Sequence, residues 1–192
     1  MLFRSPARGL ARLAHPGMSL DLGGVAKLPI LQAGVDRLRA HGLERLLLDG
    51  GGDVLALAGP ADPPWRVGLR DPAQPERLLA VLPLPNGVLA SSGDYERQRV
   101  VAGRRYHHLL DPRTGYPTEG LHGLSLLGEQ VAQVNGLGAA AMVLGPRQAP
   151  AWLAAQGVAA VLVQTDGRVR FTGGLAARLQ APPGVDHVRG AA

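Results

Sequence analysis

Short apolar runs separated by turn-forming residues recur along most of the chain, and this spacing constrains its fold more than any other feature. The runs at residues 45–49, 54–59 and 158–165 are rich in Leu, Val and Ala, and each has the length of one strand. Gly, Pro and Asp stand between the runs, and Asp166-Gly167 is a dipeptide that favours a tight hairpin turn. The sequence therefore predicts many short strands that are joined largely as hairpins.

Three segments have helical rather than strand character. Apolar residues recur at helical spacing over residues 29–41, where Pro29 suits a first helical turn. Residues 131–145 are rich in small side chains and predict a second helix, and residues 147–157 predict a third. Strands in one sheet with helices packed around it indicate the α+β class: a single domain with a largely antiparallel sheet and flanking helices.

The length of 192 residues suits one domain with a core and is short for two. We expect an irregular lead-in at residues 1–18, the domain at 19–178 and a loose tail at 179–192. The lead-in has no apolar core of signal-peptide length and no small-residue cleavage site. No apolar run approaches the length of a membrane-spanning helix. The sequence leaves the compartment open.

The charge of the chain argues against nucleic-acid binding, although the formal net charge is +5. Nineteen of the 20 basic residues are arginine, and they are scattered and mixed with acidic residues. A phosphate backbone needs a clustered basic stripe with interleaved aromatic residues, and no segment has one. The absence of cysteine excludes disulfides and thiolate metal sites. Lys27 is the single lysine, kept either for its compact charge or by chance.

Two glycine-containing clusters lie at or just before the starts of predicted helices. In "DLGGVAK", residues 21–27, Gly23 and Gly24 have no side chains to cover the backbone, so a phosphate or a metal could reach main-chain atoms. A packing role for these glycines is the alternative. In "QVNGLGAAA", residues 133–141, Asn135 either caps a helix or offers its side-chain oxygen to a hard cation.

Adjacent histidines mark the stretch "RRYHHLLDPRTGYP", residues 104–117. On a strand, His107 and His108 point to opposite faces, so only one of them can face a given site. In the turn that follows, a guanidinium such as that of Arg113 could grip a pyrophosphate bidentately, and His108 could act as a general base. The alternative is a pair of surface strands with solvated charges.

Taken in order, "DLGGVAK", "DGGGDV", "SSGDYER" and "RYHHLLDPRTGYP" resemble the motifs of the FAD:protein FMN transferases, the ApbE-like family. The resemblance implies an enzyme that splits FAD at its pyrophosphate with the assistance of Mg²⁺. It implies transfer of FMN through a phosphoester bond to a Ser or Thr hydroxyl of a partner flavoprotein, with release of AMP. Phosphoryl transfer depends mainly on positioning and on charge neutralisation, which residues of these types can supply.

The resemblance also implies roles for individual residues. His108 corresponds to the family's base, and His107, which faces the other way, is expected to be structural. Asp21, Lys27 and Leu110 correspond to residues of the FAD pocket, and we place Arg113 there as well. Gly24 would offer its carbonyl to the metal, and Asn135 stands at a metal-ligand position.

The chain departs from the family pattern at three places. Asn135 and Ala139 stand where the family has a metal-binding Asp and Thr. Leu28-Pro29 and Gln32 replace a Gly-Tyr pair and an Asp, and family members carry a further segment ahead of the first motif. Three hypotheses follow: an FMN transferase, a non-catalytic member that binds flavin or a partner, and a FAD pyrophosphatase that gives FMN and AMP. Family members commonly work in the periplasm or at the bacterial inner membrane.

Overall fold

A six-stranded antiparallel sheet forms the centre of the molecule, seen here in a computed structural model that describes residues 2–95, 98–102 and 104–184. The strand order is β12-β11-β10-β7-β4-β3, and every neighbouring pair is antiparallel. The strands are β3 (Leu46–Asp49), β4 (Val54–Leu57), β7 (Gly87–Gly93), β10 (Leu121–Gly128), β11 (Ala159–Gln164) and β12 (Val169–Phe171). The predicted α+β class with a largely antiparallel sheet is confirmed.

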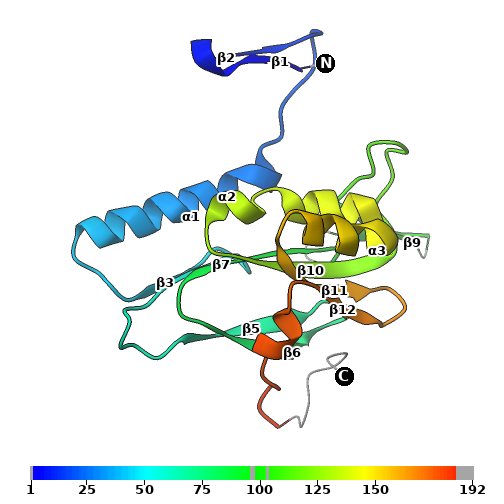
Figure 1. Ribbon diagram of the computed structural model, residues 1–192. Helices are drawn as coiled ribbons and strands as arrows, with labels where there is room; N and C mark the ends of the chain where they lie inside the picture. The colour runs from blue at the N-terminus through cyan, green and yellow to red at the C-terminus, as the bar shows by residue number, and fades with distance from the viewer. Residues whose placement is uncertain (1, 96–97, 103, 185–192) are drawn as a thin grey trace.

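Different layers cover the two faces of this sheet (Figure 1). Helices α1 (Gly23–Ala40), α2 (Val131–Val134) and α3 (Leu137–Ala155) cover one face. The hairpin of β5 (Trp65–Asp71) and β6 (Gln74–Leu84) covers the other, together with the 3-10 helix η2 (Leu175–Arg178). The molecule is therefore a three-layer sandwich of helices, sheet and hairpin.

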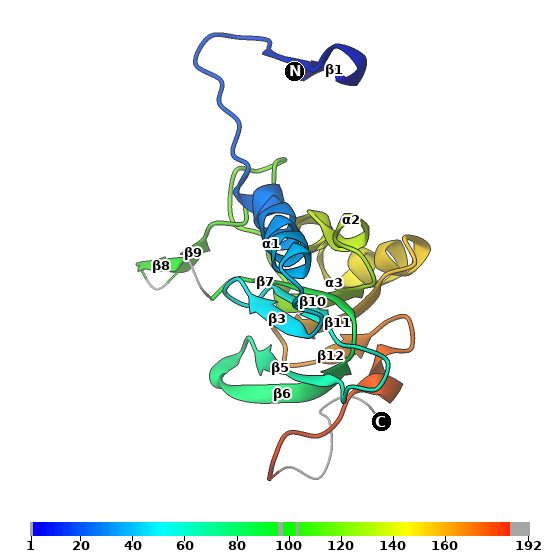
Figure 2. The same cartoon turned by 90° about the vertical axis from the view of Figure 1, so that its left-hand side faces the viewer.

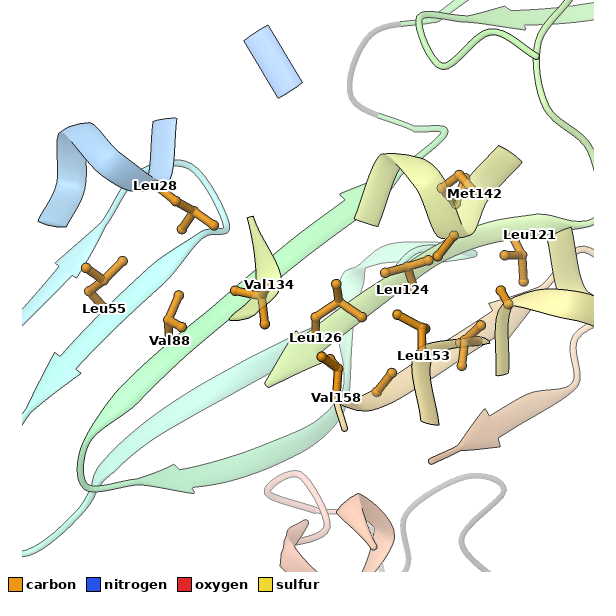
Figure 3. Packing of buried hydrophobic residues seen from close by; sticks show 14 of the residues in the cluster. Leu28, Leu55, Val88, Leu121, Leu124, Leu126, Val134, Met142, Leu153 and Val158 are labelled. Atoms are coloured by element: carbon orange, nitrogen blue, oxygen red, sulfur yellow. The ribbon is translucent and has the colours of Figure 1, made fainter. Parts of the chain in front are cut away.

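Alternation along the strands divides the apolar residues between two cores. Leu124 and Leu126 of β10 face the helices, and Figure 3 shows them among Val134, Met142 and Leu153. Their neighbour Leu127 belongs to the opposite core with β5 and β6. Successive side chains of a strand point to opposite faces, so a strand buried on both sides is apolar throughout. This explains why the predicted strands appear as continuous apolar runs.

Helix α1 begins at Gly23, six residues before the predicted start at Pro29. An Asp21 carboxylate oxygen accepts a hydrogen bond from the Gly23 N–H at 2.7 Å, and the Leu22 carbonyl accepts from the N–H groups of Val25 and Ala26. These bonds satisfy donors that a helix start leaves free. The glycines of the first motif therefore form the first turn of a helix, and Pro29 lies inside it.

Helix α3 contains most of the second and third predicted helices, with one interruption inside it. Gly145 has φ 71° and ψ −179°, which breaks the helical geometry in the middle of α3. The break lies where the sequence predicts the end of one helix and the start of the next. Only the short helix α2 differs from that prediction, because Gly136 with φ 78° separates it from α3.

Two antiparallel hairpins lie outside the sandwich. One joins β1 (Leu2–Ser5) and β2 (Leu10–Leu13) through the 3-10 helix η1 (Pro6–Arg8), and it stands apart from the main body in both views (Figures 1 and 2). It occupies part of residues 1–18, which were expected to be irregular. The other joins β8 (Gln98–Val101) and β9 (Arg104–His107).

The expected loose tail, 179–192, begins in an ordered position. Gln180 and Val81 exchange two backbone hydrogen bonds of 2.8 and 2.9 Å, which hold the chain against β6. Residues 185–192 lie outside the described part of the chain. Among the described residues, no helix combines the length and the apolar character that crossing a membrane requires.

Candidate active site

The amino end of α1 exposes main-chain groups of the first motif. Gly23 and Gly24 form its first turn, and a Cβ placed on Gly24 would meet no atom within 4 Å. The first N–H groups of a helix point away from it and carry partial positive charge, which favours anionic ligands. Asp21 is exposed and bonds to Gly23, so its role in the structure is to organise this turn.

Lys27 is held by a buried carboxylate. Its Nζ lies 2.8 Å from Oδ2 of Asp53, whose side chain is 9% exposed while that of Lys27 is 45% exposed. The second oxygen of Asp53 accepts the Ser91 N–H at 2.9 Å. A buried carboxylate is tolerated only with such partners, so this contact ties α1, the β3–β4 turn and β7 together.

Pro29 leaves one carbonyl of α1 without its helical hydrogen-bond donor, and Asn135 supplies a donor instead. In an α-helix the N–H of residue 29 would bond to the carbonyl of Val25, but proline has no N–H. The side-chain Nδ2 of Asn135 donates to that Val25 carbonyl at 3.0 Å. Asn135 is thus the C-terminal cap residue of α2, and the expectation that it caps the start of the following helix is wrong, because Gly136 occupies that position.

The two adjacent histidines have different environments. His107 is buried; its Nδ1 accepts from the Leu109 N–H at 3.3 Å, which leaves Nε2–H to donate to the Thr118 carbonyl at 3.0 Å. These two contacts hold the ring against the loop between β9 and β10, as expected for a structural residue. His108 is exposed, and no described residue bonds to its ring.

The turn at residues 111–115 has the predicted geometry. The carbonyl of Asp111 accepts from the N–H groups of Thr114 and Gly115, and Gly115 has φ 73°. The Arg113 guanidinium forms a two-pronged ion pair with the Asp111 carboxylate, with a shortest N–O distance of 2.7 Å. The hydrogen bond from this guanidinium lowers the pKa of Asp111 to about 2.

The seven predicted site residues fall into two groups. Gly24 and Lys27 lie in the amino-terminal half of α1, and Asp21 and Asn135 each donate to or accept from a residue of that half. His108, Leu110 and Arg113 lie on the connection between β9 and β10, where Leu110 is 52% exposed. Figure 1 shows this connection beside α3, where Nη2 of Arg113 lies 3.5 Å from the Val143 carbonyl.

The residues expected to bind Mg²⁺ do not fit that ion. Within α1 the Gly24 carbonyl is in position to accept the Leu28 N–H, and Asn135 turns its amide nitrogen toward Val25. Mg²⁺ is usually held by one or two carboxylates. Among the described residues, no group of three His, Cys, Asp or Glu side chains could hold a metal.

A cavity of about 270 Å³ lies on the other side of the central sheet, beneath the β5–β6 hairpin. None of the seven predicted residues lines it. Gly52 and Ser91, which flank Asp53 along the chain and in space, form part of its wall. The cavity therefore borders the site at Asp53 without containing it.

Sequence reasoning assigned no role to two acidic residues that the structure places near the motifs. Asp53 was quoted only within "DGGGDV", although an acid directly after three glycines was a signal that the turn holds a carboxylate. Asp94, buried at 5% exposure, lies 3.0 Å from Nδ1 of His122. No short sequence pattern connects these last two residues, because 28 positions separate them.

We expect Arg113→Gln to raise the pKa of Asp111 from about 2 toward the ordinary 3.8, because the main cause of the depression is the hydrogen bond from Arg113. A carboxylate with a depressed folded-state pKa stabilises the fold above its unfolded-state pKa, and this contribution is lost as the pH falls toward 2. An NMR titration of the Asp111 carboxyl carbon in both proteins measures the midpoint. Equal midpoints would show that the pairing is absent in solution.

We expect Asn135→Asp to lower the melting temperature in metal-free buffer, because the new carboxylate loses the hydrogen bond and faces the Val25 carbonyl. One such bond contributes about 1 kcal/mol, or about 2–4 °C for a protein of this size. Adding Mg²⁺ should restore stability in the variant and leave the wild type unchanged, because only the variant has a carboxylate to offer.

Pro29→Ala provides the matched background for this experiment. Alanine restores the helical N–H donor to the Val25 carbonyl, so Asn135→Asp should cost less stability in that background than in the wild type. An equal cost in the two backgrounds would contradict the coupling between Pro29 and Asn135.

Comparison with known proteins places these features in a family. The family model described as the ApbE family matches residues 3–173. The FAD:protein FMN transferase of Rhodobacter capsulatus is 36% identical over 174 residues, which are 90% of this chain and 33% of that protein. That of Treponema pallidum is 34% identical over 181 residues, 88% of this chain and 50% of that protein. The chain thus spans at most half the length of these two relatives.

Solved structures agree. The ApbE protein of Thermotoga maritima superposes with a TM-score of 0.83 at 27% identity, covering 92% of this chain and 58% of that one. The flavinyl transferase ApbE of Pseudomonas stutzeri gives a TM-score of 0.70 at 29% identity, covering 85% of this chain and 52% of that one. With a family match along most of its length and the same fold, this chain belongs to the ApbE family.

Proposed function

We propose that this chain carries the FAD-binding and FMN-transferring site of a FAD:protein FMN transferase. In this reaction a Ser or Thr hydroxyl of an acceptor flavoprotein attacks the phosphorus on the FMN side of the FAD pyrophosphate. The phosphoanhydride bond breaks, a phosphoester bond to the acceptor forms, and AMP leaves. The hydroxyl proton passes to a base at the site.

The observation that carries the proposal is the exposure of His108 on an anchored loop that also carries the exposed Arg113. Its ring is exposed, while the preceding His107 anchors the backbone through the Thr118 carbonyl. A fixed backbone with an exposed imidazole suits a general base, because phosphoryl transfer relies on positioning. His108 is therefore assigned the role of the base that takes the proton from the acceptor hydroxyl.

The pyrophosphate of FAD is assigned to the amino end of α1. The amino end of α1 carries the partial positive charge of the helix dipole, and Lys27 adds a compact cation oriented by Asp53. Arg113 is 71% exposed in its pair with Asp111, so its remaining donors stay accessible to a phosphate oxygen. Leu110 offers an exposed apolar surface to a ring of the flavin nucleotide.

No step of this proposal passes through Mg²⁺. The resemblance implies that the ion assists the reaction, yet Asn135 and Gly24 do not make a site for it. Charge neutralisation at the pyrophosphate is therefore assigned to Lys27, Arg113 and the helix end.

A non-catalytic flavin-binding protein is the second candidate function. What favours it is the amide of Asn135, which acts as a hydrogen-bond donor to Val25 where the family has a metal-binding carboxylate. A FAD pyrophosphatase, with water in place of the acceptor hydroxyl, is the third. The three candidates differ in what happens to FAD and to the acceptor.

We expect His108→Ala to abolish FMN transfer, by about 100-fold or more, and to leave FAD binding intact, because the residue moves a proton without holding the substrate. The protein is incubated with FAD, Mg²⁺ and a flavin-acceptor domain that carries a Thr modification site. The mass of the acceptor reports transfer, AMP release reports cleavage, and quenching of FAD fluorescence reports binding. His41→Ala, at an exposed histidine beyond the end of α1, is the control.

The outcomes separate the candidates. A mass gain that requires His108 supports the transferase. FAD quenching without cleavage identifies the non-catalytic binder, and AMP release without an acceptor identifies the pyrophosphatase. Transfer at the wild-type rate by His108→Ala would remove His108 from the proposal.

A further inference from the structure

The hairpin of β8 and β9 forms an arm that no other strand supports. Gln98 pairs with His107 at its base, and Val101 pairs with Arg104 at its tip. In the described part of the chain these strands form a separate two-stranded sheet. Figure 2 shows the arm extending to the side, away from the central sheet. Both of its outer edges therefore lie outside the hydrogen-bonded sandwich.

Two neighbouring valines on this arm face solvent. Val100 is 67% exposed and Val101 is 58% exposed. Because adjacent residues of a strand point to opposite faces, both faces of the arm present an apolar side chain to water. A two-stranded hairpin of this kind is marginally stable alone, and a third strand can add to its free edge through main-chain hydrogen bonds.

The charge and the position of the arm indicate what that strand would be. Residues 97–107 contain arginines at positions 97, 99, 104 and 105 and no acidic residue. Arg99 is exposed on β8. Strand β9 ends at His107 and continues directly into His108, the proposed base. A segment paired along the arm would thus lie next to the reacting histidine.

We propose that the β8–β9 arm is the docking edge for the acceptor polypeptide, which adds an extended, acidic segment as a third strand and so brings its hydroxyl to His108. The apolar contacts come from Val100 and Val101, and the exposed Arg99 favours an acidic segment. This inference rests on the proposed function, since it assigns a partner to the same site.

The experiment measures binding of the acceptor separately from chemistry. A fluorescently labelled flavin-acceptor domain is titrated with the full chain, and FMN transfer is followed in parallel. The double variant Val100→Glu/Val101→Glu removes the apolar contacts and adds repulsive charge. Val100→Thr/Val101→Thr keeps the β-branched shape, and Leu43→Glu changes an exposed leucine just after α1. FAD quenching verifies that each variant is folded.

The proposal predicts that the double glutamate variant weakens acceptor binding by about tenfold or more, while the threonine and Leu43 variants bind within about threefold of wild type. Salt should weaken wild-type binding, because the exposed Arg99 contributes. Backbone amides of the arm should exchange more slowly with solvent when the acceptor is bound.

Equal acceptor affinity of wild type and the glutamate variant, or no binding by wild type, would overturn the proposal. It would also be overturned if the glutamate variant changed only self-association, measured by light scattering, or only binding to vesicles with anionic lipid. Binding without FMN transfer would refute the proposed function and leave the docking edge standing. If FMN transfer occurs and the glutamate variant binds the acceptor as tightly as wild type, the docking edge is refuted and the proposed function stands.

Discussion

The buried carboxylate of Asp53 is the contact on which the arrangement of the candidate site depends. One oxygen holds Lys27 of α1 at 2.8 Å, and the other accepts the Ser91 N–H of β7 at 2.9 Å. The Asp53 carbonyl also closes the glycine turn by accepting the Gly50 N–H. Because a desolvated charge requires such partners, the helix, the turn and the strand are held in one geometry. The single lysine of the chain is thereby directed to the amino end of α1.

A second contact fixes the same helix from its other side and explains two departures from the family at once. Pro29 leaves the Val25 carbonyl without its helical donor, and Asn135 supplies one from the end of α2. An aspartate at position 135 could not donate this hydrogen bond. The two residues are therefore compatible with each other, and together they make position 135 a tie between two helices.

The strands could be predicted from the sequence because their signals are local. Apolar runs, glycine turns and the Asp-Gly hairpin each act within a few residues, and the structure has strands at those places. The predicted start of α1 was wrong because Pro29 suits a first helical turn by its local preference. In the structure the helix already begins with the turn at Gly23, where Asp21 accepts the Gly23 N–H. Propensity alone could not show that a side chain 106 positions away repairs the gap at Pro29.

The individual residues of the candidate site could be predicted from the sequence, but the contacts between them could not. The motifs identified seven residues, and His107 is buried while His108 is exposed, as expected, although β9 ends at His107. The link between Lys27 and Asp53 was missed, because it joins residues 26 positions apart on different elements. The same holds for the pairing of Arg113 with Asp111, which engages Nε and Nη2 of the guanidinium.

The central claim is that the amino end of α1, with Lys27 held by Asp53, binds the pyrophosphate of FAD. The most direct measurement is the dissociation constant of FAD, by fluorescence quenching, for wild type and Lys27→Gln. The amide can still donate to Asp53, so the carboxylate keeps a partner while the positive charge is removed. Arg168→Gln, at the exposed ion pair with Asp166 on the β11–β12 hairpin, is the matched control. We predict that FAD binds about tenfold or more weakly to Lys27→Gln and unchanged to the control. Equal affinities for all three proteins would contradict the account.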